Sequence, residues 1–338
     1  MKKLIILLLI LLLGCKPETQ PAGLTKNAPE LRELYFLTED SVQLPVHRWM
    51  PGLSKPRAII IGVHGFNDYG LFLRRPAEYF SRQGIAVYTF DQRGFGAAPR
   101  RGYWAGRDTY AADLRSFVRT IKQRHPGLPV FLLGESMGGA VVIEAIRYGH
   151  MAKIDGIVLV APALWPREIM PWYQTTLLWL LAYTVPWMTF SGEGVGAMLS
   201  DNRDMMREFD NDPLVLRQTR VEALHGLTDL MDSAFENASQ LGGKILLLYG
   251  EKDEIIPKKA INAFLQGLYS SGESGKIIVF YPNGYHLLLR DLKAEIIWQD
   301  ITTWVLSDGA KTLPSNADKT SNLKLILPVN TWQQAERH

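Results

Sequence analysis

The pentapeptide GESMG at positions 134–138 stands between an apolar run and a helical pattern. The run, Val130–Leu133, is short and rich in Val and Leu, which predicts a buried strand. A strand that turns sharply into a helix leaves no room for side chains two residues to either side of the serine, so Gly134 and Gly138 suit these positions. Such a turn presents the Ser136 hydroxyl at the carboxyl end of the sheet. The pattern therefore predicts an α/β fold with a serine nucleophile at this turn.

Short apolar runs alternate with helical patterns along most of the chain, which is typical of βαβ units. An antiparallel pair is expected at Glu33–Thr38 and Gln43–Met50, followed by buried strands at Ala58–Val63, Ala86–Phe90, Val130–Leu133, Ile157–Val160, Ile245–Tyr249 and Ile277–Tyr281. Helices are expected at Arg75–Gln83, Thr109–Arg124, Gly138–Tyr148, Lys258–Tyr269 and Leu292–Leu306. The prediction is a mostly parallel, eight-stranded sheet with helices on both faces.

More than eighty residues separate the strand ending at Val160 from the strand beginning at Ile245. A crossover needs far fewer, so we predict a helical cap inserted after strand six, at about residues 163–240. Within it, Ile169–Phe190 is a stretch of 22 residues without a charge. Its length would admit a membrane span, but its prolines, and its position between two strands of one sheet, argue against that. Two readings stay open: a cap helix over an apolar pocket, and a cap whose tryptophans also lie in a membrane interface.

A serine hydroxyl needs a base, and the acid and histidine are expected to follow it in that order along the chain. His286 comes in a turn just after the last buried strand, which places it at the same edge of the sheet as Ser136. His225 falls in the cap and His150 at a helix end, and we interpret both as surface groups. His286 is therefore the expected base.

The orienting carboxylate is expected in the turn after the preceding strand. That turn begins at Gly250 and contains Asp253, with Glu251 and Glu254 as alternatives. Asp253 is favoured because the turn, which ends in a proline, places it three residues beyond the glycine. Its carboxylate would hold the His286 tautomer and stabilise the imidazolium that forms.

An oxyanion in the transition state needs at least two donors, each worth roughly 3–4 kcal/mol. The Met137 N–H follows the nucleophile and is the first expected donor. The second is the Phe66 N–H, in the loop after the third strand, where Gly65 lets the backbone turn. His64 could be mistaken for a base, but at a strand end upstream of the serine it is expected to order this loop.

Five segments together resemble the α/β-hydrolase superfamily, in the branch of monoacylglycerol lipases and lysophospholipases. They are HGF at 64–66, DQRGFG at 91–96, GESMGG at 134–139, GEKD at 250–253 and NGYH at 283–286, within a resemblance from about Leu31 to Leu306. The resemblance implies Ser136, Asp253 and His286 as the catalytic residues, with the Phe66 and Met137 amides as the oxyanion hole. It implies no metal or organic cofactor. We expect the hydrolase domain at residues 31–308 and a polar C-terminal tail at 309–338.

The implied activity is hydrolysis of a carboxylic ester of an acyl lipid, a monoacylglycerol or a lysophospholipid, through an acyl-enzyme. An aminopeptidase or amidase on the same fold is the main alternative, since Glu168, Glu193, Asp201 and Asp204 could hold a free amine. A small-ester esterase and a non-catalytic lipid-binding lipoprotein complete the alternatives.

The pattern of the N-terminal residues predicts a targeting segment. Two lysines precede the ten-residue apolar run Leu4–Leu13, which is too short to cross a bilayer and has the length of a signal-peptide core. The sequence around Gly14 and Cys15, the only cysteine, resembles the lipobox of bacterial lipoproteins, whereas a plain signal peptide with an incidental cysteine is the alternative. The resemblance implies cleavage after residue 14, a lipid on Cys15, a tether at 15–30, and anchoring in the bacterial cell envelope facing away from the cytoplasm.

The charge balance bears on possible partners. Without the two leader lysines, 35 basic residues stand against 34 acidic ones, a net charge of +1. A near-neutral chain offers no electrostatic attraction for nucleic acid, so none is expected as a partner. A lone cysteine excludes internal disulfides and cysteine-rich metal sites. The expected partners are an acyl-lipid or ester substrate and a membrane surface.

Overall fold

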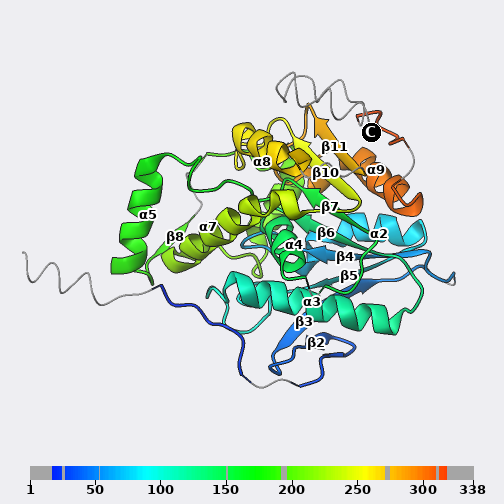
Figure 1. Ribbon diagram of the computed structural model, residues 1–338, viewed down its shortest axis with the longest axis horizontal. Coiled ribbons are helices and arrows are strands. Elements are labelled where there is room, and N and C mark those ends of the chain that lie inside the picture. The colour runs from blue at the N-terminus through cyan, green and yellow to red at the C-terminus, as the bar shows by residue number, and fades with distance from the viewer. Residues whose placement is uncertain are drawn as a thin grey trace, which may run out of the picture.

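A computed structural model of the 338-residue chain describes residues 17–24, 27–52, 54–149, 151–191, 196–270, 275–309 and 312–317. Its main sheet has the strand order β1-β2-β3-β5-β4-β6-β7-β10-β11 (Figure 1). The strands are β1 (Glu30–Leu31), β2 (Tyr35–Leu37), β3 (Gln43–Trp49), β4 (Ala58–Val63), β5 (Ile85–Phe90), β6 (Val130–Glu135), β7 (Gly156–Val160), β10 (Ile245–Gly250) and β11 (Lys276–Tyr281). Pairing is antiparallel from β1 to β5 and parallel from β5 to β11.

All eight expected strands are present in the expected order, but the prediction of an eight-stranded sheet was wrong by one. The ninth strand, β1, pairs Glu30 with Leu37 and Leu31 with Phe36 at the antiparallel edge. Two residues cannot carry an alternating pattern, so nothing in the sequence indicates this strand.

Two separate apolar cores lie on the two faces of the sheet, because successive side chains of a strand point to opposite sides. Ile59 and Ile61 of β4 belong to one core, and Ile60 belongs to the other. The first core is covered by α3 (Arg107–Arg124), α4 (Met137–Arg147) and α8 (Lys258–Ser270), and the second by η1 (Gly70–Leu73), α2 (Arg74–Arg82) and α9 (Ala294–Leu306). The parallel strands β4, β5, β6, β7 and β10 are buried along their whole length, which explains why they appear in the sequence as continuous apolar runs.

The expected cap lies between β7 and β10. It contains α5 (Trp172–Thr184), β8 (Thr189–Ser191), α6 (Arg203–Asn211), β9 (Gln218–Arg220), α7 (Val221–Glu236) and η2 (Ala238–Gln240), with β8 and β9 paired antiparallel. α7 packs on α4 of the catalytic body, whereas α5 packs along α7 at the outer edge of the molecule (Figure 1). Within the described ranges no helix is long and apolar enough to cross a membrane, and the 13 residues of α5 span only about 20 Å.

The termini are described only in part. The predicted signal peptide at 1–14 and its neighbour Cys15 lie outside the described residues, as do residues 318–338 of the predicted tail. The described start of the tail contacts the body: Leu313 is buried in the second core, and the Ser315 N–H donates to the Asp300 carboxylate at 2.9 Å.

Candidate active site

Ser136 lies at the sharp turn that the GESMG pattern predicts. It connects β6 to α4 with φ at 52°, a left-handed conformation that is strained for a residue with a side chain. A Cβ on Gly138 would lie 2.0 Å from the Val63 carbonyl oxygen, and one on Gly134 would lie 2.5 Å from the Gly138 oxygen. The turn therefore requires glycine at both positions that the sequence analysis named.

His286 and Asp253 lie in line behind the serine hydroxyl. Ser136 Oγ is 3.0 Å from His286 Nε2, and His286 Nδ1 is 2.8 Å from Asp253 Oδ2. The other oxygen of Asp253 accepts hydrogen bonds from two backbone amides of its own turn, Ile255 N–H and Ile256 N–H. The histidine and aspartate are buried, whereas the serine remains half-exposed. The three residues expected to act together are thus hydrogen-bonded in the order that proton transfer from the serine requires.

Two glycines bring the acid turn and the histidine turn together. A Cβ on Gly250 would lie 2.4 Å from the carbonyl carbon of Gly284, so the two backbones touch without side chains between them. The Lys252 N–H donates to the Gly284 oxygen at 2.9 Å and fixes this approach. The parallel pairing of β10 with β11 places both turns at the same edge of the sheet.

The alternative acids bind elsewhere. Glu251 forms an exposed ion pair with Lys258 at 3.0 Å, and the Glu254 carboxylate accepts from the Met198 N–H at 2.8 Å.

Of the alternative histidines, His225 corrects an expectation. It is not a surface group, because it is largely buried between the ring of Tyr183 and the carboxylate of Asp229, 3.4 Å away. The sequence around His225 predicts only a helix and does not indicate its contact with Tyr183, which belongs to another helix of the cap. His150 lies outside the described residues.

The loop expected to carry the second oxyanion donor lies against the serine. Gly65 closely approaches the nucleophile, because a Cβ on Gly65 would lie 3.3 Å from the Cβ of Ser136. Phe66, whose amide is the expected donor, is the next residue along the chain. His64 is fully buried, and burial lowers its pKa, which keeps the ring neutral. Its Nδ1 is 2.8 Å from the Gly65 oxygen and its Nε2 accepts from the Gln92 N–H at 2.9 Å. His64 therefore orders the loop, as expected, and the Phe66 and Met137 amides remain the predicted donors.

An apolar cavity of about 480 Å³ opens beside Ser136 and His286. The cap supplies much of its wall, including Met170, Leu178, Phe209, Leu224, Leu227 and Met231. Three charged residues, Asp68, Glu135 and Arg290, also line it. The size and lining suit an extended apolar group next to the serine hydroxyl.

The charged residues form a network that the sequence analysis missed. The Arg290 guanidinium lies 2.7 Å from the Asp68 carboxylate and 2.9 Å from the Glu135 carboxylate, and all three side chains are buried or nearly so. Burial raises the pKa of the Glu135 carboxyl. Burial would lower the pKa of Arg290, but the carboxylates of Asp68 and Glu135 outweigh this effect and raise it. Only the long separation along the chain hides the network, since no local pattern connects positions 68, 135 and 290.

The three described acidic residues among those considered for amine binding do not lie at the cavity. Glu168 is exposed, Asp201 accepts from the Leu292 N–H at 2.8 Å, and Asp204 pairs with Arg207. Of these three, none lines the cavity, and Glu193 lies outside the described residues.

Comparison with known proteins gives consistent matches over most of the chain. Residues 54–293 match the Hydrolase_4 family, which is described as serine aminopeptidase S33. The monoacylglycerol lipase of Mycolicibacterium smegmatis is 25% identical over 279 residues, covering 80% of this chain and 96% of that protein. The monoglyceride lipase of Rattus norvegicus is 27% identical over 306 residues, covering 88% and 99%. The crystal structure of Paleococcus ferrophilus monoacylglycerol lipase superposes with a TM-score of 0.67 at 25% identity, covering 78% of this chain and 99% of that one.

Proposed function

Because the chain belongs to the Hydrolase_4 family of α/β-hydrolases, we propose that it hydrolyses carboxylic esters of acyl lipids. The favoured substrate is a monoacylglycerol, with a lysophospholipid as the second lipid monoester to be tested. One observation carries the proposal: the hydrogen-bonded row of Ser136, His286 and Asp253 opens on an apolar cavity of about 480 Å³, whose lining suits an acyl chain. The relatives named as monoacylglycerol and monoglyceride lipases support the same substrate class.

The mechanism follows from the order of these groups. Ser136 Oγ attacks the ester carbonyl while His286 Nε2 takes its proton, and Asp253 stabilises the resulting imidazolium. The Phe66 and Met137 amides donate to the oxyanion that develops. His286 then protonates the leaving alcohol, which departs and leaves the acyl group on the serine. A water molecule, deprotonated by His286, releases the fatty acid and restores the hydroxyl.

The family description raises the aminopeptidase alternative directly. Recognition of a free α-amine requires a carboxylate that is available to the substrate. The two carboxylates in the described cavity wall, Asp68 and Glu135, are both paired with Arg290. Neither carboxylate is therefore free to pair with a substrate amine, and burial, which raises the pKa of Glu135, disfavours a second negative charge here, so the cavity favours an uncharged acyl group over a cationic one.

The test is a chain-length series on residues 16–338. We expect turnover of p-nitrophenyl esters to rise from acetate to palmitate and to vanish in Ser136→Ala. Monoacylglycerol and lysophospholipid of the same acyl chain are then compared. Activity confined to the shortest esters would indicate a small-ester esterase, and faster cleavage of an aminoacyl anilide would indicate an aminopeptidase. A folded protein without any of these activities would instead fit a lipid-binding lipoprotein.

We further propose that a lipid on Cys15 anchors the enzyme in the bacterial cell envelope, facing away from the cytoplasm. The lipobox-like sequence supports the anchor. Exposed aromatic side chains on α5 support contact of the cap with the same membrane, since aromatic residues favour the interface. Cys15→Ala should move the protein from the membrane fraction to the soluble fraction and abolish incorporation of labelled palmitate. A plain signal peptide would leave both unchanged.

A further inference from the structure

Residues 17–23, which we name the strap, lie fixed against the body ahead of the first strand. Four of its backbone N–H groups donate to four separate parts of the fold. The pairs are Glu18 to the Glu222 carboxylate at 3.2 Å, Gln20 to the Trp104 oxygen at 2.8 Å, Ala22 to Thr109 Oγ1 at 3.2 Å and Gly23 to the Asp40 carboxylate at 2.8 Å. The Arg100 guanidinium also donates to Gln20 Oε1 at 2.6 Å. A segment held at this many points is not a free spacer, although its composition suggests one.

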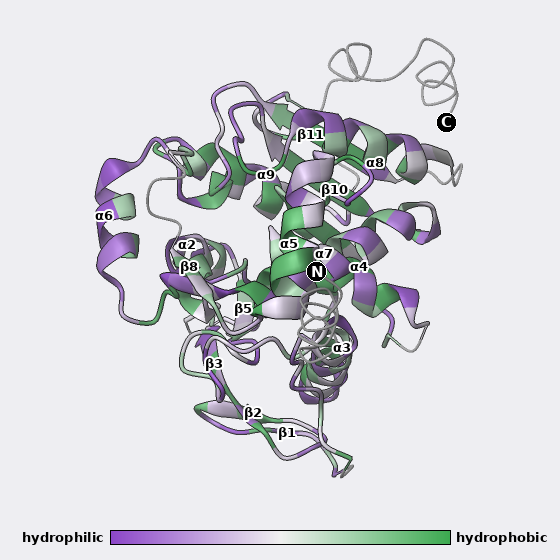
Figure 2. Ribbon diagram, turned by 90° about the vertical axis from the view of Figure 1, so that its left-hand side faces the viewer, coloured by the Kyte–Doolittle hydropathy of each residue, from purple (hydrophilic) through white to green (hydrophobic). Residues whose placement is uncertain are grey.

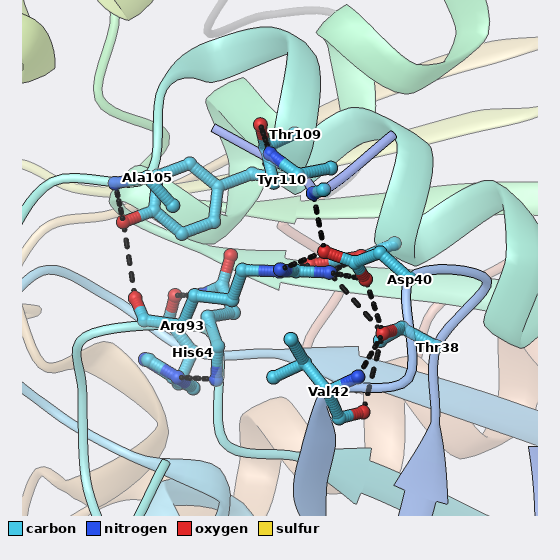
Figure 3. Close-up of polar contacts among 12 residues, drawn as sticks. Thr38, Asp40, Val42, His64, Arg93, Ala105, Thr109 and Tyr110 are labelled. Carbon is cyan, nitrogen blue, oxygen red and sulfur yellow. Dashed lines mark hydrogen bonds and ion pairs between the residues drawn. The ribbon is translucent and has the colours of Figure 1, made fainter. Parts of the chain in front are cut away.

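Two of these acceptors, Asp40 and Glu222, are themselves held by ion pairs. Asp40 lies 2.6 Å from the guanidinium of Arg93 (Figure 3). The same guanidinium lies 2.6 Å from Asp113. Burial opposes ionisation of Asp40, but the Arg93 guanidinium holds the pKa of that carboxyl well below its usual range. The Asp40 carboxylate therefore stays charged as it accepts from Gly23, which strengthens that hydrogen bond. At the other end of the strap, Glu222 is buried and accepts from Arg220 at 2.5 Å.

The strap begins beside the end of α5. Glu222, which holds Glu18, also donates its own backbone N–H to the Pro186 oxygen at 3.1 Å. Its neighbour Val221 donates to the Met188 oxygen at 2.9 Å. The start of α7 thus holds both the strap and the chain that leaves α5, and Figure 1 shows the first described residues at that end of α5.

The outer side of α5 and the segment after it form an exposed apolar face. Trp172 is 76% exposed, Trp187 is 56% exposed and Trp179 is 54% exposed. Tyr173, Leu177, Leu180 and Phe190 add to this face, which we name the α5 face. Figure 2 views the molecule from the side on which α5 lies. The same helix contributes Leu178 and Gln174 to the wall of the cavity. A surface that covers the α5 face would therefore lie one helix diameter, about 10 Å, from the acyl pocket.

We propose that the strap is a locator, which holds the lipid anchor beside the α5 face so that both engage one lipid bilayer. Cys15 is two residues before Pro17, and two Cα–Cα steps place it no more than about 7.6 Å from the docked strap. A free tether spanning 15–30 would instead have an end-to-end distance of about 20 Å and would leave the orientation of the enzyme open. This inference rests on the proposed anchoring, and it adds which side of the molecule meets the bilayer.

The test attaches the protein to vesicles chemically, so it does not depend on whether cells lipidate it. Because Cys15 is the only cysteine, residues 15–338 can be coupled through it to a maleimide lipid in phosphatidylcholine vesicles. Two readouts follow: hydrogen exchange of peptides from 172–190, and hydrolysis of monoacylglycerol in the vesicles relative to soluble p-nitrophenyl acetate. Failure of the proposed anchoring would appear in the Cys15→Ala experiment and not here.

Two matched insertions distinguish the effect of the strap from the effect of the anchor alone. A flexible Gly-Ser insertion of about 12 residues between Lys16 and Pro17 lowers the effective concentration of the α5 face at the bilayer by about 20-fold. We expect it to remove the exchange protection of 172–190 and to lower vesicle activity several-fold, with soluble activity unchanged. The same insertion after Leu24 leaves the strap bonds in place, and should keep both protection and activity.

The proposal is overturned if coupling leaves 172–190 unprotected, or if the two insertions behave alike. Protection that rises with protein concentration in the absence of vesicles would identify a second copy of the chain as the occupant of the α5 face. That outcome would also overturn it.

Discussion

Arg290 is a single cation that connects three catalytic loops. Its guanidinium pairs with Asp68 in the loop after β4 and with Glu135, the residue before the nucleophile. It follows His286 by four residues, and its side chain is only 10% exposed. Replacing it therefore tests whether the alignment of Ser136 with His286 depends on this buried ion network.

The expected cost of Arg290→Met can be worked from the burial of the three charges. Removing one partner of a buried ion pair costs about 3–5 kcal/mol, because the other charge is left without compensation. We expect the free energy of unfolding to fall by about that amount. Arg290→Lys should lose less, since the ammonium keeps the charge but not the planar fork that reaches both carboxylates.

The loss of stability caused by Arg290→Met is expected to depend on pH. Burial already raises the pKa of Glu135, and loss of Arg290 removes the cation that opposes this rise. A carboxyl whose pKa is higher in the folded state adds stability below its unfolded pKa and loses that stability as pH rises through its folded pKa. The destabilisation by Arg290→Met should therefore be larger at about pH 8 than at about pH 5.

Urea unfolding followed by tryptophan fluorescence at both pH values measures this difference, and kcat on p-nitrophenyl butyrate measures the alignment. We expect kcat to fall by about 10- to 100-fold, since small displacements of reacting groups have effects of that size. An unfolding free energy within about 1 kcal/mol of the parent at both pH values would refute the assigned network. An unchanged kcat would refute its role in positioning.

Three further predictions concern other parts of the fold. Burial raises the pKa of Asp291 to about 6, so its contribution to stability is present below the ordinary value of 3.8 and is lost as pH rises through about 6. Asp291→Asn should remove about 3 kcal/mol of pH dependence across that interval in urea titrations. Gly138→Ala should lower unfolding free energy by at least about 3 kcal/mol because its Cβ meets a backbone oxygen, whereas Gly52→Ala, in open space, should be neutral. Leu178→Trp should lower kcat/KM on palmitate relative to butyrate by about 10-fold or more, and the exposed Leu180→Trp on the same helix should not.

The sequence predicted those residues of the site that are each positioned by a single local turn after a strand. Ser136, Asp253 and His286 each follow a buried strand, and parallel strands bring their carboxyl ends to one edge. The glycines could be predicted because their signal is local: Gly134 and Gly138 each lie within two residues of the serine they accommodate. Chain order and strand pattern were therefore sufficient to place the three side chains together.

The parts that the sequence did not predict depend on contacts between distant segments. Arg290 reaches Asp68 and Glu135 across more than 150 positions, and no residue type or spacing marks such a pair in advance. His225 reads as a polar helical position, and only the packing of α5 against α7 buries it. The strap has the polar, proline-containing composition of a spacer, and its docking depends on acceptors that the fold assembles around Asp40 and Glu222.

α5 has features that suit both expected roles of the cap, the wall of an apolar pocket and contact with a membrane interface. A helix that is apolar on all sides is normally buried on all sides, and α5 has no charged residue between Trp172 and Thr184. One side of it lines the cavity, but only Ala182 is fully buried, and Trp172, Tyr173 and Trp179 remain exposed to water. An exposed apolar face of this kind marks an interaction site, because burying it is favourable in proportion to its area. The cavity wall and the proposed bilayer contact are therefore compatible: α5 lines the cavity with one side and leaves on its other side an exposed face that a lipid surface would cover.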